Sequence, residues 1–306
     1  MSFTRLEELV ELAESRHLRI AEVMIMREQA ESGTSAGEIL ARMADQFAVM
    51  EEAARRGVSS PLPSRGGLIG GEAHQLWEAI ASRPTLLGPV AFRAMAYAMG
   101  VSVVNAAMGR IVATPTAGAA GILPGVLVAL LDTGQFTREA MTEALLTAAA
   151  LGLVIANSAS IAGASGGCQA EVGSATAMTA GTVVELYGGS PRQVVDAVGL
   201  ALTNSLGLVC DPVAGLVEVP CLYRNGLHAV TALAAAECAL AGVRQVIPPD
   251  EVVGAMRDIG NQLPLALRET GIGGLAGTPT GRRLRRQILG EDDHGSREGT
   301  GSPQIS

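Results

Sequence analysis

The sequence predicts an all-α protein, and three observations carry this prediction. Hydrophobic residues make up 48% of the 306-residue chain, whereas aromatic residues make up only 3%, so the apolar content is mostly alanine, leucine and valine. Glycine is abundant, at 38 copies. This composition favours closely packed helices with small residues at their contacts over sheets that need branched and aromatic pairs. Alternating strand patterns are scarce, while helix-spaced apolar residues recur.

The first part of the chain, 1–58, is expected to form a helical subdomain. One amphipathic helix is indicated by apolar residues at helical spacing, namely Leu6, Leu9, Val10 and Ala13. Ser35 followed by Glu38 is a capping box, which predicts the start of a second helix. That helix is expected to end near Gly57, and its apolar side consists of Ile39, Met43, Phe47 and Met50.

The main body is expected to span 59–290, beginning with the loop-forming segment 59–71. Helices are predicted at 72–80 and 90–99, and from the cap Thr137 to about 156. A further helix starts at Ser190, with Pro191 in its first position and Gln193 completing a capping box. The pair Pro248–Pro249 starts another, which ends at Gly260. The polar stretch 291–306 is predicted to be a disordered tail.

The charged residues exclude several classes of protein. A net charge of −8 argues against a nucleic-acid partner, because phosphate binding needs clustered cations. The one dense basic run, 282–286, is expected to cover a helix end. All 22 basic residues are arginine. Without lysine the chain forms neither a pyridoxal-phosphate Schiff base nor a Walker A phosphate loop, so the glycine-rich segment 66–71 is not such a loop.

Two long uncharged stretches, 111–131 and 144–170, are long enough to cross a bilayer. The first contains prolines and glycines, and the second is rich in serine, glycine and asparagine. Neither has the dense leucine, isoleucine and phenylalanine of a lipid-facing helix. We expect buried helices and loops, no membrane partner, no signal peptide at the N-terminus and a cytoplasmic location.

Three of the four cysteines have settings that suggest chemistry. Cys168 follows two glycines, Cys210 precedes Asp–Pro, and Cys221 follows a proline, each on a segment expected to lie at a helix end. Ordinary core cysteines are one interpretation. The absence of a C-x-x-C pair disfavours structural zinc. The other interpretation is therefore an iron–sulfur cluster held by three thiolates, with one iron open. Cys238 lies in a plain helical run and is expected to be a small buried hydrophobe.

Long motifs extend this pattern beyond the cysteines. They read NSASIAGASGGCQAEVGSA at 157–175, LGLVCDPVAGLVEVPCLYRNG at 206–226, VNAAMGRIVATPTAGAAGILPG at 104–125, GGLIGGEA at 66–73 and ALRETGIGGLAGTPTGRRL at 266–284. Together they resemble the alpha chain of the bacterial two-subunit L-serine dehydratase, from the N-terminus to about residue 290.

The resemblance implies a helical fold and a lyase that works without pyridoxal phosphate. It implies a [4Fe–4S] cluster held by Cys168, Cys210 and Cys221, with one iron free to bind L-serine and assist its conversion to pyruvate and ammonia. It also implies a beta chain as partner, because the S-S-S-H-T segment of single-chain relatives is absent here. Cys238 lies outside every matching motif.

Substrate contacts and the general base are less defined. Expected substrate-binding residues are Asn105, Thr114, Thr116, Ser165, Arg224 and Asn225. For Arg224, an ion pair with Glu218 or Asp211 is the competing interpretation. The base is unassigned and is expected on the partner chain, because none of the four histidines lies in a recognised motif. A related cysteine desulfidase and a metal-stabilised helical scaffold remain the alternative functions.

The sequence departs from the family pattern at four positions. Gly66 and Ile69 stand where the family has threonine, Glu72 where it has aspartate, and Ala119 where serine is frequent. These departures concern substrate contacts rather than the cysteines.

Overall fold

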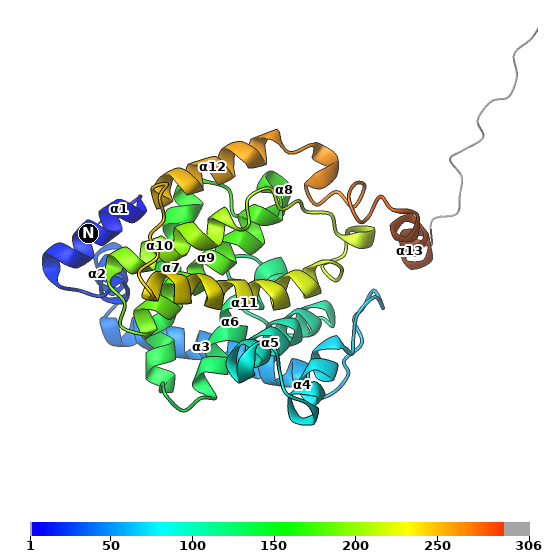
Figure 1. Cartoon of the computed structure of the whole chain (residues 1–306), viewed down its shortest axis with the longest axis horizontal. Helices are drawn as coiled ribbons and strands as arrows, with labels where there is room; N and C mark the ends of the chain where they lie inside the picture. Colours follow the sequence, from blue (N-terminus) through cyan, green and yellow to red (C-terminus); the bar gives the residue numbers. More distant parts are fainter. Residues whose placement is uncertain (1, 291–306) are drawn as a thin grey trace, which may run out of the picture.

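The computed structural model describes residues 2–290, and it is built from α-helices (Figure 1). Among these residues the β pairing is limited to one isolated bridge between Cys210 and Arg268. The all-α prediction is therefore confirmed. The helices are α1 (Leu6–Arg16), α2 (Ile20–Ser32), α3 (Ala36–Ser59), α4 (Glu72–Ser82), α5 (Gly88–Ala106), α6 (Ile122–Leu131), α7 (Arg138–Ser158), α8 (Gly163–Gly166), α9 (Ser174–Leu186), α10 (Pro191–Thr203), α11 (Cys221–Leu240), α12 (Pro249–Gln262) and α13 (Pro279–Leu289). Four short turns are η1 (Ala117–Ala119), the π-helical η2 (Gln169–Gly173), η3 (Val213–Gly215) and η4 (Leu265–Leu267).

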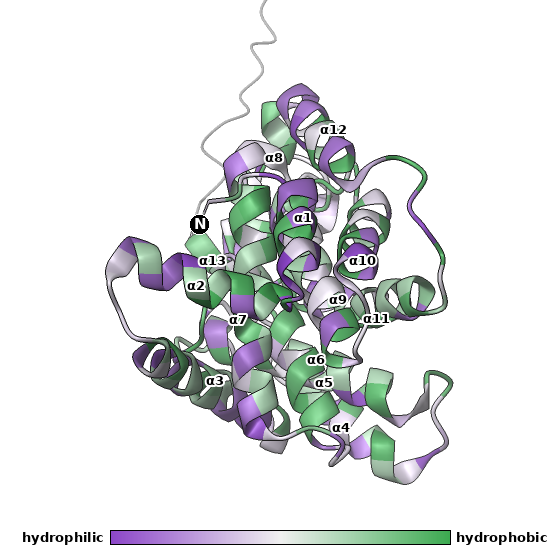
Figure 2. Ribbon diagram, turned by 90° about the vertical axis from the view of Figure 1, so that its left-hand side faces the viewer, coloured by the Kyte–Doolittle hydropathy of each residue, from purple (hydrophilic) through white to green (hydrophobic). Residues whose placement is uncertain are grey.

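The centre of the fold is a group of apolar helices, α5, α6, α7, α9 and α11, which pack on one another. Helix α6 is buried from Ile122 to Leu130, and Figure 2 shows it as hydrophobic while α1 and α12 carry many hydrophilic residues. Small residues set the contacts: a Cβ on Gly57 would lie 2.1 Å from the Gly100 carbonyl oxygen. The predicted packing through small residues is thus present where α3 crosses α5.

Helix starts follow the predicted capping signals. The Ser35 and Ser190 hydroxyls each accept a hydrogen bond from the backbone N–H three residues later, at 3.3 Å, which closes both capping boxes. Thr137 caps α7 in the same way. Helix α12 begins at Pro249 as predicted and ends two residues beyond the expected Gly260. The local cap chemistry therefore fixes these boundaries.

The two terminal regions lie at opposite ends of the long axis, with α1 on one side and α13 on the other (Figure 1). Helix α1 is attached to α12 because the Asp250 carboxylate accepts hydrogen bonds from the N–H groups of Leu6 and Glu7, at 2.8 and 3.0 Å. Helix α13 packs against η3, the short turn that lies between Cys210 and Cys221 in the sequence. The division at 58/59 stays a prediction, and the predicted tail 291–306 lies outside the described residues.

Helix α7 is the one described helix that is long and apolar enough to cross a membrane. Of its apolar window, 61% is buried inside the fold, as in the core helix of a globular protein. Helix α6, which belongs to the other uncharged stretch, is likewise buried.

Candidate metal centre

The segment that carries Cys168 makes a sharp turn between α8 and η2. Gly167 has φ +76°, and a Cβ there would lie 2.6 Å from the Leu263 side chain, so the turn requires glycine. Gln169 then fixes the turn: its amide donates to the carbonyls of Gly166 and Met256 at 3.0 and 2.9 Å and accepts from Gly207 N–H at 2.9 Å. Cys168 is thus held between three segments of chain.

Cys210 lies on the extended segment that forms the isolated bridge. Its N–H donates to the Leu267 carbonyl at 2.9 Å, and its carbonyl accepts from Glu269 N–H at 2.7 Å. Glu269 has φ +61°, a strained conformation for a residue with a side chain. The bridge therefore brings the motif at 266–284 beside the central cysteines.

Cys221 is the first residue of α11, so this cysteine starts a helix rather than ending one. Asn225, one turn later, is 1% exposed. Its amide donates to the carbonyls of Gly118 and Cys221 at 2.7 and 2.9 Å, and its Oδ1 accepts from Gly121 N–H at 2.9 Å. The first turn of α11 is thereby fixed to η1 and the start of α6.

The side chains of Cys168, Cys210 and Glu171 meet in the interior. Their Sγ and carboxylate oxygen atoms lie within 4.8 Å of one another, and all three residues are buried. The Cys221 Sγ lies outside this group, although the thiol is buried and the charge of Cys168 acts on it. The structure thus brings two predicted cysteine ligands together with a carboxylate, and places the third nearby.

The electrostatics of the three thiols differ. The hydrogen bond from Cys210 lowers the pKa of Cys168, and the positive charge of Arg224 acts in the same direction. The same hydrogen bond, together with burial, raises the pKa of Cys210. Burial raises the pKa of Cys221. Without a bound metal, Cys168 is therefore the thiol that most readily carries negative charge.

Cys238 is exposed, so the prediction that it is buried was wrong. It lies on the outer side of α11, whereas Ala235, Ala236 and Ala239 face the core. In a run composed mostly of alanine, hydrophobic periodicity does not identify the buried face. Its exposure separates it from the three buried cysteines.

Two carboxylates at the centre were missed by the sequence analysis. Glu171 is 7% exposed and accepts a short hydrogen bond from Thr116, and burial raises its pKa. Glu269 lies close enough for its charge to act on Glu171, Cys210 and Cys221. Both belong to the motifs quoted above, and an acidic residue three positions after a candidate ligand was the available signal for Glu171.

Glycines leave the centre free of side chains where its polar atoms converge. A Cβ on Gly163 would lie 2.9 Å from Cys210 Sγ, 3.1 Å from Glu171 Oε2 and 3.4 Å from Glu269 Oε2. A Cβ on Gly118 would lie 2.6 Å from Glu171 Oε1. Bare backbone is therefore required on two sides of the centre.

The predicted substrate-binding residues occupy different environments. Asn105 donates to the Ala117 carbonyl at 3.3 Å, close to Thr116. The Thr114 hydroxyl is buried and has no hydrogen-bond partner within residues 2–290. Ser165 is exposed on α8. A cavity of about 450 Å³ opens beside this region, lined by residues that include Asn105 and Ala117. Substrate contact by these residues stays a prediction.

Arg224 pairs with Asp211, not with Glu218. Its Nη2 donates to Asp211 Oδ1 at 2.9 Å, and its Nη1 donates to Cys168 Sγ at 3.3 Å and to the Val209 carbonyl at 2.8 Å. Glu218 instead accepts from Ser64 Oγ at 2.7 Å and from backbone N–H groups of the glycine-rich loop.

The four departures from the family pattern have defined positions. The Gly66 N–H donates to Glu218 at 2.7 Å, and Ile69 is buried. The Glu72 carboxylate accepts from two backbone N–H groups before α4, at 2.8 and 3.0 Å. Ala119 is fully buried beside Cys168 and Cys210. Only the last of these positions borders the cysteines directly.

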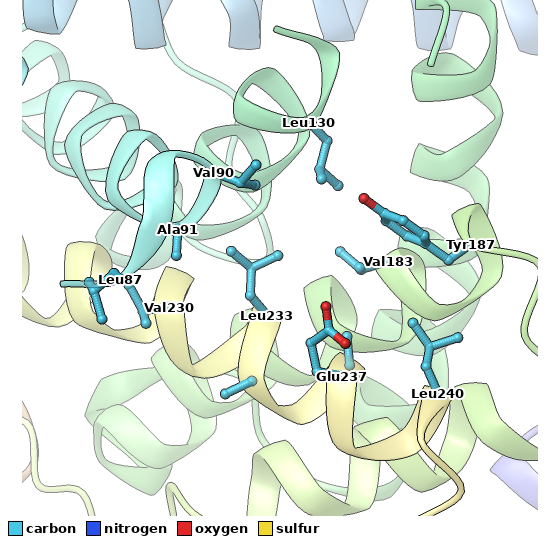
Figure 3. Close-up of a pocket in the computed structure, with 12 residues that line it drawn as sticks. Leu87, Val90, Ala91, Leu130, Val183, Tyr187, Val230, Leu233, Glu237 and Leu240 are labelled. Atoms are coloured by element: carbon cyan, nitrogen blue, oxygen red, sulfur yellow. The ribbon is translucent and has the colours of Figure 1, made fainter. Parts of the chain in front are cut away.

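A separate apolar groove of about 350 Å³ lies between α5, α9 and α11 (Figure 3). Leucine and valine side chains line most of it, and its polar groups are the Glu237 carboxylate and the Tyr187 hydroxyl. It contains none of the predicted site residues.

The donors at this centre suit an iron–sulfur group better than a lone ion of a hard metal. Thiolates are the preferred ligands of such clusters. A cluster spreads its ligands farther apart than a single ion does, which fits Cys221 lying outside the close group. Glycine at position 163 lets the Cys210 sulfur pack directly against the backbone, and Arg224 donates a hydrogen bond to the Cys168 sulfur at 3.3 Å.

Comparison with known proteins identifies the family. The family model described as serine dehydratase alpha chain matches residues 15–276. The chain is 49% identical over 298 residues to the probable L-serine dehydratase alpha chain of Bacillus subtilis (strain 168), covering 97% of this chain and 99% of that one. It is 42% identical to the L-serine dehydratase alpha chain of Peptoniphilus asaccharolyticus, covering 94% and 98%. The L-serine dehydratase of Streptomyces coelicolor (strain ATCC BAA-471 / A3(2) / M145) is longer, and 88% of this chain matches 60% of it at 37% identity. The chain therefore belongs to the family of serine dehydratase alpha chains.

Proposed function

We propose that this chain is the alpha subunit of an L-serine dehydratase, a lyase that converts L-serine to pyruvate and ammonia without pyridoxal phosphate. The observation that supports this proposal is that Cys168 and Cys210, from two separate family motifs, meet in one buried group with Glu171, while the buried Cys221 lies close enough for the charge of Cys168 to act on it. The family names support the reaction, and the absence of lysine from the chain supports a mechanism without a Schiff base.

Cys168, Cys210 and Cys221 would hold a [4Fe–4S] cluster. Cys238 is exposed on the outer side of α11, so these three thiolates leave one iron without a cysteine ligand. When bound, such a cluster supplies a Lewis-acid iron that stabilises the hydroxyl leaving from the substrate.

The residues around the centre would orient L-serine. The carboxylates of Glu171 and Glu269 favour the positively charged ammonium group of an amino acid. Asn105, Thr114, Thr116, Ser165, Arg224 and Asn225 remain the proposed substrate contacts. Arg224 uses three of its five N–H donors on Cys168, Val209 and Asp211, so two are left for a substrate carboxylate. Asn225 would in addition hold Cys221 and η1 in place.

The general base and the closure of the site are assigned to a serine dehydratase beta chain. His74 and His228 are hydrogen-bonded through Nδ1 to backbone carbonyls at 2.9 and 3.0 Å, and His17 ends α1. His294 lies outside the described residues. Two relatives are named as the alpha chain of an L-serine dehydratase, which supports a second chain as partner. A cytoplasmic location suits three reduced thiols.

The test is anaerobic co-expression with the beta chain, followed by measurement of pyruvate formed from L-serine and from L-cysteine. The proposal predicts iron in the purified complex, pyruvate from serine, and little activity with either subunit alone. Preferential release of sulfide from cysteine would identify a desulfidase instead. A colourless protein with stoichiometric zinc and no turnover would identify a metal-stabilised scaffold.

A further inference from the structure

Resting on the proposed function, we propose that Arg224 is a positioning residue for the cluster. Held in place by Asp211, it hydrogen-bonds the sulfur of Cys168, withdraws electron density from the cluster and raises its reduction potential. This role concerns the ligand sphere and is distinct from binding the substrate carboxylate.

The geometry of Arg224 is directed at Cys168. It lies on the first turn of α11, three residues after Cys221, and its side chain is only 14% exposed. Nη1 donates to Cys168 Sγ at 3.3 Å and to the Val209 carbonyl at 2.8 Å. The guanidinium therefore connects the chain segments of all three cysteines. Arg224 lies on the helix that Cys221 starts, and it donates hydrogen bonds to the sulfur of Cys168 and to the carbonyl of Val209, the residue before Cys210.

Asp211 fixes the guanidinium from the other side. Its side chain is 4% exposed, and Oδ1 accepts from Arg224 Nη2 at 2.9 Å. Oδ2 accepts from Leu275 N–H at 2.7 Å, and Gly274, at φ +56°, passes so close that a Cβ would lie 2.3 Å from that oxygen. The segment 271–275 thus holds Asp211, which holds Arg224 against Cys168. This explains why the motif at 266–284, whose Leu275 lies 64 residues after Asp211, belongs to the same site.

The charge arrangement has a direct electronic consequence. Hydrogen bonds to ligand sulfurs and nearby charge set the reduction potentials of iron–sulfur clusters. Because the pair is buried, solvent ions screen the Arg224 charge weakly. Arginine stays protonated throughout the working range of pH, so the effect is constant. Withdrawal of electron density through Cys168 makes an iron without a thiolate ligand a stronger Lewis acid.

The experiment uses the anaerobic two-chain holoenzyme and compares wild type with Arg224→Gln, Arg224→Lys and Asp211→Asn. Reduction potentials are measured by a redox titration monitored by electron paramagnetic resonance, and iron–thiolate stretching frequencies by resonance Raman spectroscopy. Arg257→Gln is the matched control, because Arg257 is 52% exposed and pairs with its neighbour Asp258 on α12.

We expect Arg224→Gln to keep its iron, to shift the potential to a more negative value and to change the iron–thiolate frequencies. We expect kcat to fall by about tenfold or more, and any change in the KM for L-serine reports the separate proposed contact of Arg224 with the substrate carboxylate. Arg224→Lys should restore part of the potential shift, Asp211→Asn should give a smaller shift in the same direction, and Arg257→Gln should match wild type.

Unchanged potential and Raman spectrum in an iron-loaded Arg224→Gln enzyme would overturn the inference. A large rise in KM without a shift in potential would also overturn it and would assign Arg224 to substrate binding. If Arg224→Gln does not fold or bind iron, the Asp211→Asn potential decides, and an unshifted value there refutes the role. A wild-type enzyme without a cluster would instead refute the proposed function, and this inference with it.

Discussion

Gly163→Ala tests the requirement for bare backbone at the centre. Gly163 is the first residue of α8 and has no positive φ, so its backbone conformation accepts alanine. The added methyl group would lie 2.9 Å from Cys210 Sγ and 3.1 Å from Glu171 Oε2, whereas ordinary contacts begin near 3.4 Å. The Cys210 sulfur would therefore have to move by about 0.5 Å, which is about the tolerance of a metal or catalytic site.

The expected cost in folding free energy is about 1–3 kcal/mol, because the methyl group overpacks a filled interior. The larger effect is expected on the cofactor: iron per chain falls, and serine turnover falls by about tenfold or more. Anaerobic iron quantification, the pyruvate assay and urea denaturation measure the three effects. Gly254→Ala is the matched control, because it lies within α12 and its Cβ would have only the end of the Arg257 side chain, at 4.0 Å, within reach.

Full iron content and unchanged turnover in Gly163→Ala, under conditions where Gly254→Ala behaves like wild type, would refute this reasoning. Such a result would mean that the close approach of Cys210 Sγ to the Gly163 backbone is not needed to hold the cofactor.

Three further predictions concern Asn225, Glu51 and Cys238. Asn225→Ala should lower the free energy of unfolding by about 2–4 kcal/mol in urea denaturation, because the Gly118 carbonyl and Gly121 N–H lose their buried partner; a loss below about 1 kcal/mol would contradict this. Burial alone would raise the pKa of Glu51, but hydrogen bonds from Arg138 and Arg55 lower this pKa below 4.5. The ionised Glu51 carboxylate therefore stabilises the fold above pH 4.5, and this stabilisation is lost as the pH falls through the folded-state pKa. Glu51→Gln should weaken this acid sensitivity and lower the free energy of unfolding at pH 7 by about 1–3 kcal/mol. Cys238 should react with a maleimide in the native protein, and Cys238→Ala should retain iron and turnover; iron loss in that variant would overturn the ligand assignment.

The helical fold was predictable where local chemistry decides it. Ser35 and Ser190 mark helix starts through hydrogen bonds to residues three positions away, so the sequence contains both partners. The π-helical turn η2 was not predictable, because tertiary bonds of Gln169 to Met256 and Gly207 hold it. Helix α2 also escaped prediction, and its first N–H groups are capped by Glu185, which is 165 residues away from Ile20.

The sequence singles out the cysteines of the candidate site, whereas its carboxylates and the contacts around them could not be read from it. Two glycines precede Cys168, Asp–Pro follows Cys210 and a proline precedes Cys221, which singles these cysteines out. Glu171 and Glu269 reach the centre only because η2 and the Cys210 bridge turn them inward. Pairing of Arg224 with Asp211 rather than Glu218 depends on the glycine-rich loop, which already surrounds the Glu218 carboxylate.

The central claim is that three cysteines of this chain hold an iron–sulfur cluster with one iron open to substrate. Mössbauer spectroscopy of the iron-57 holoenzyme, with and without L-serine, tests it most directly. The account predicts a [4Fe–4S] spectrum in which the signal of a single iron changes when serine is added. Absence of iron would contradict it, and so would a cluster in which the Mössbauer signal of none of the four irons changes when serine is added.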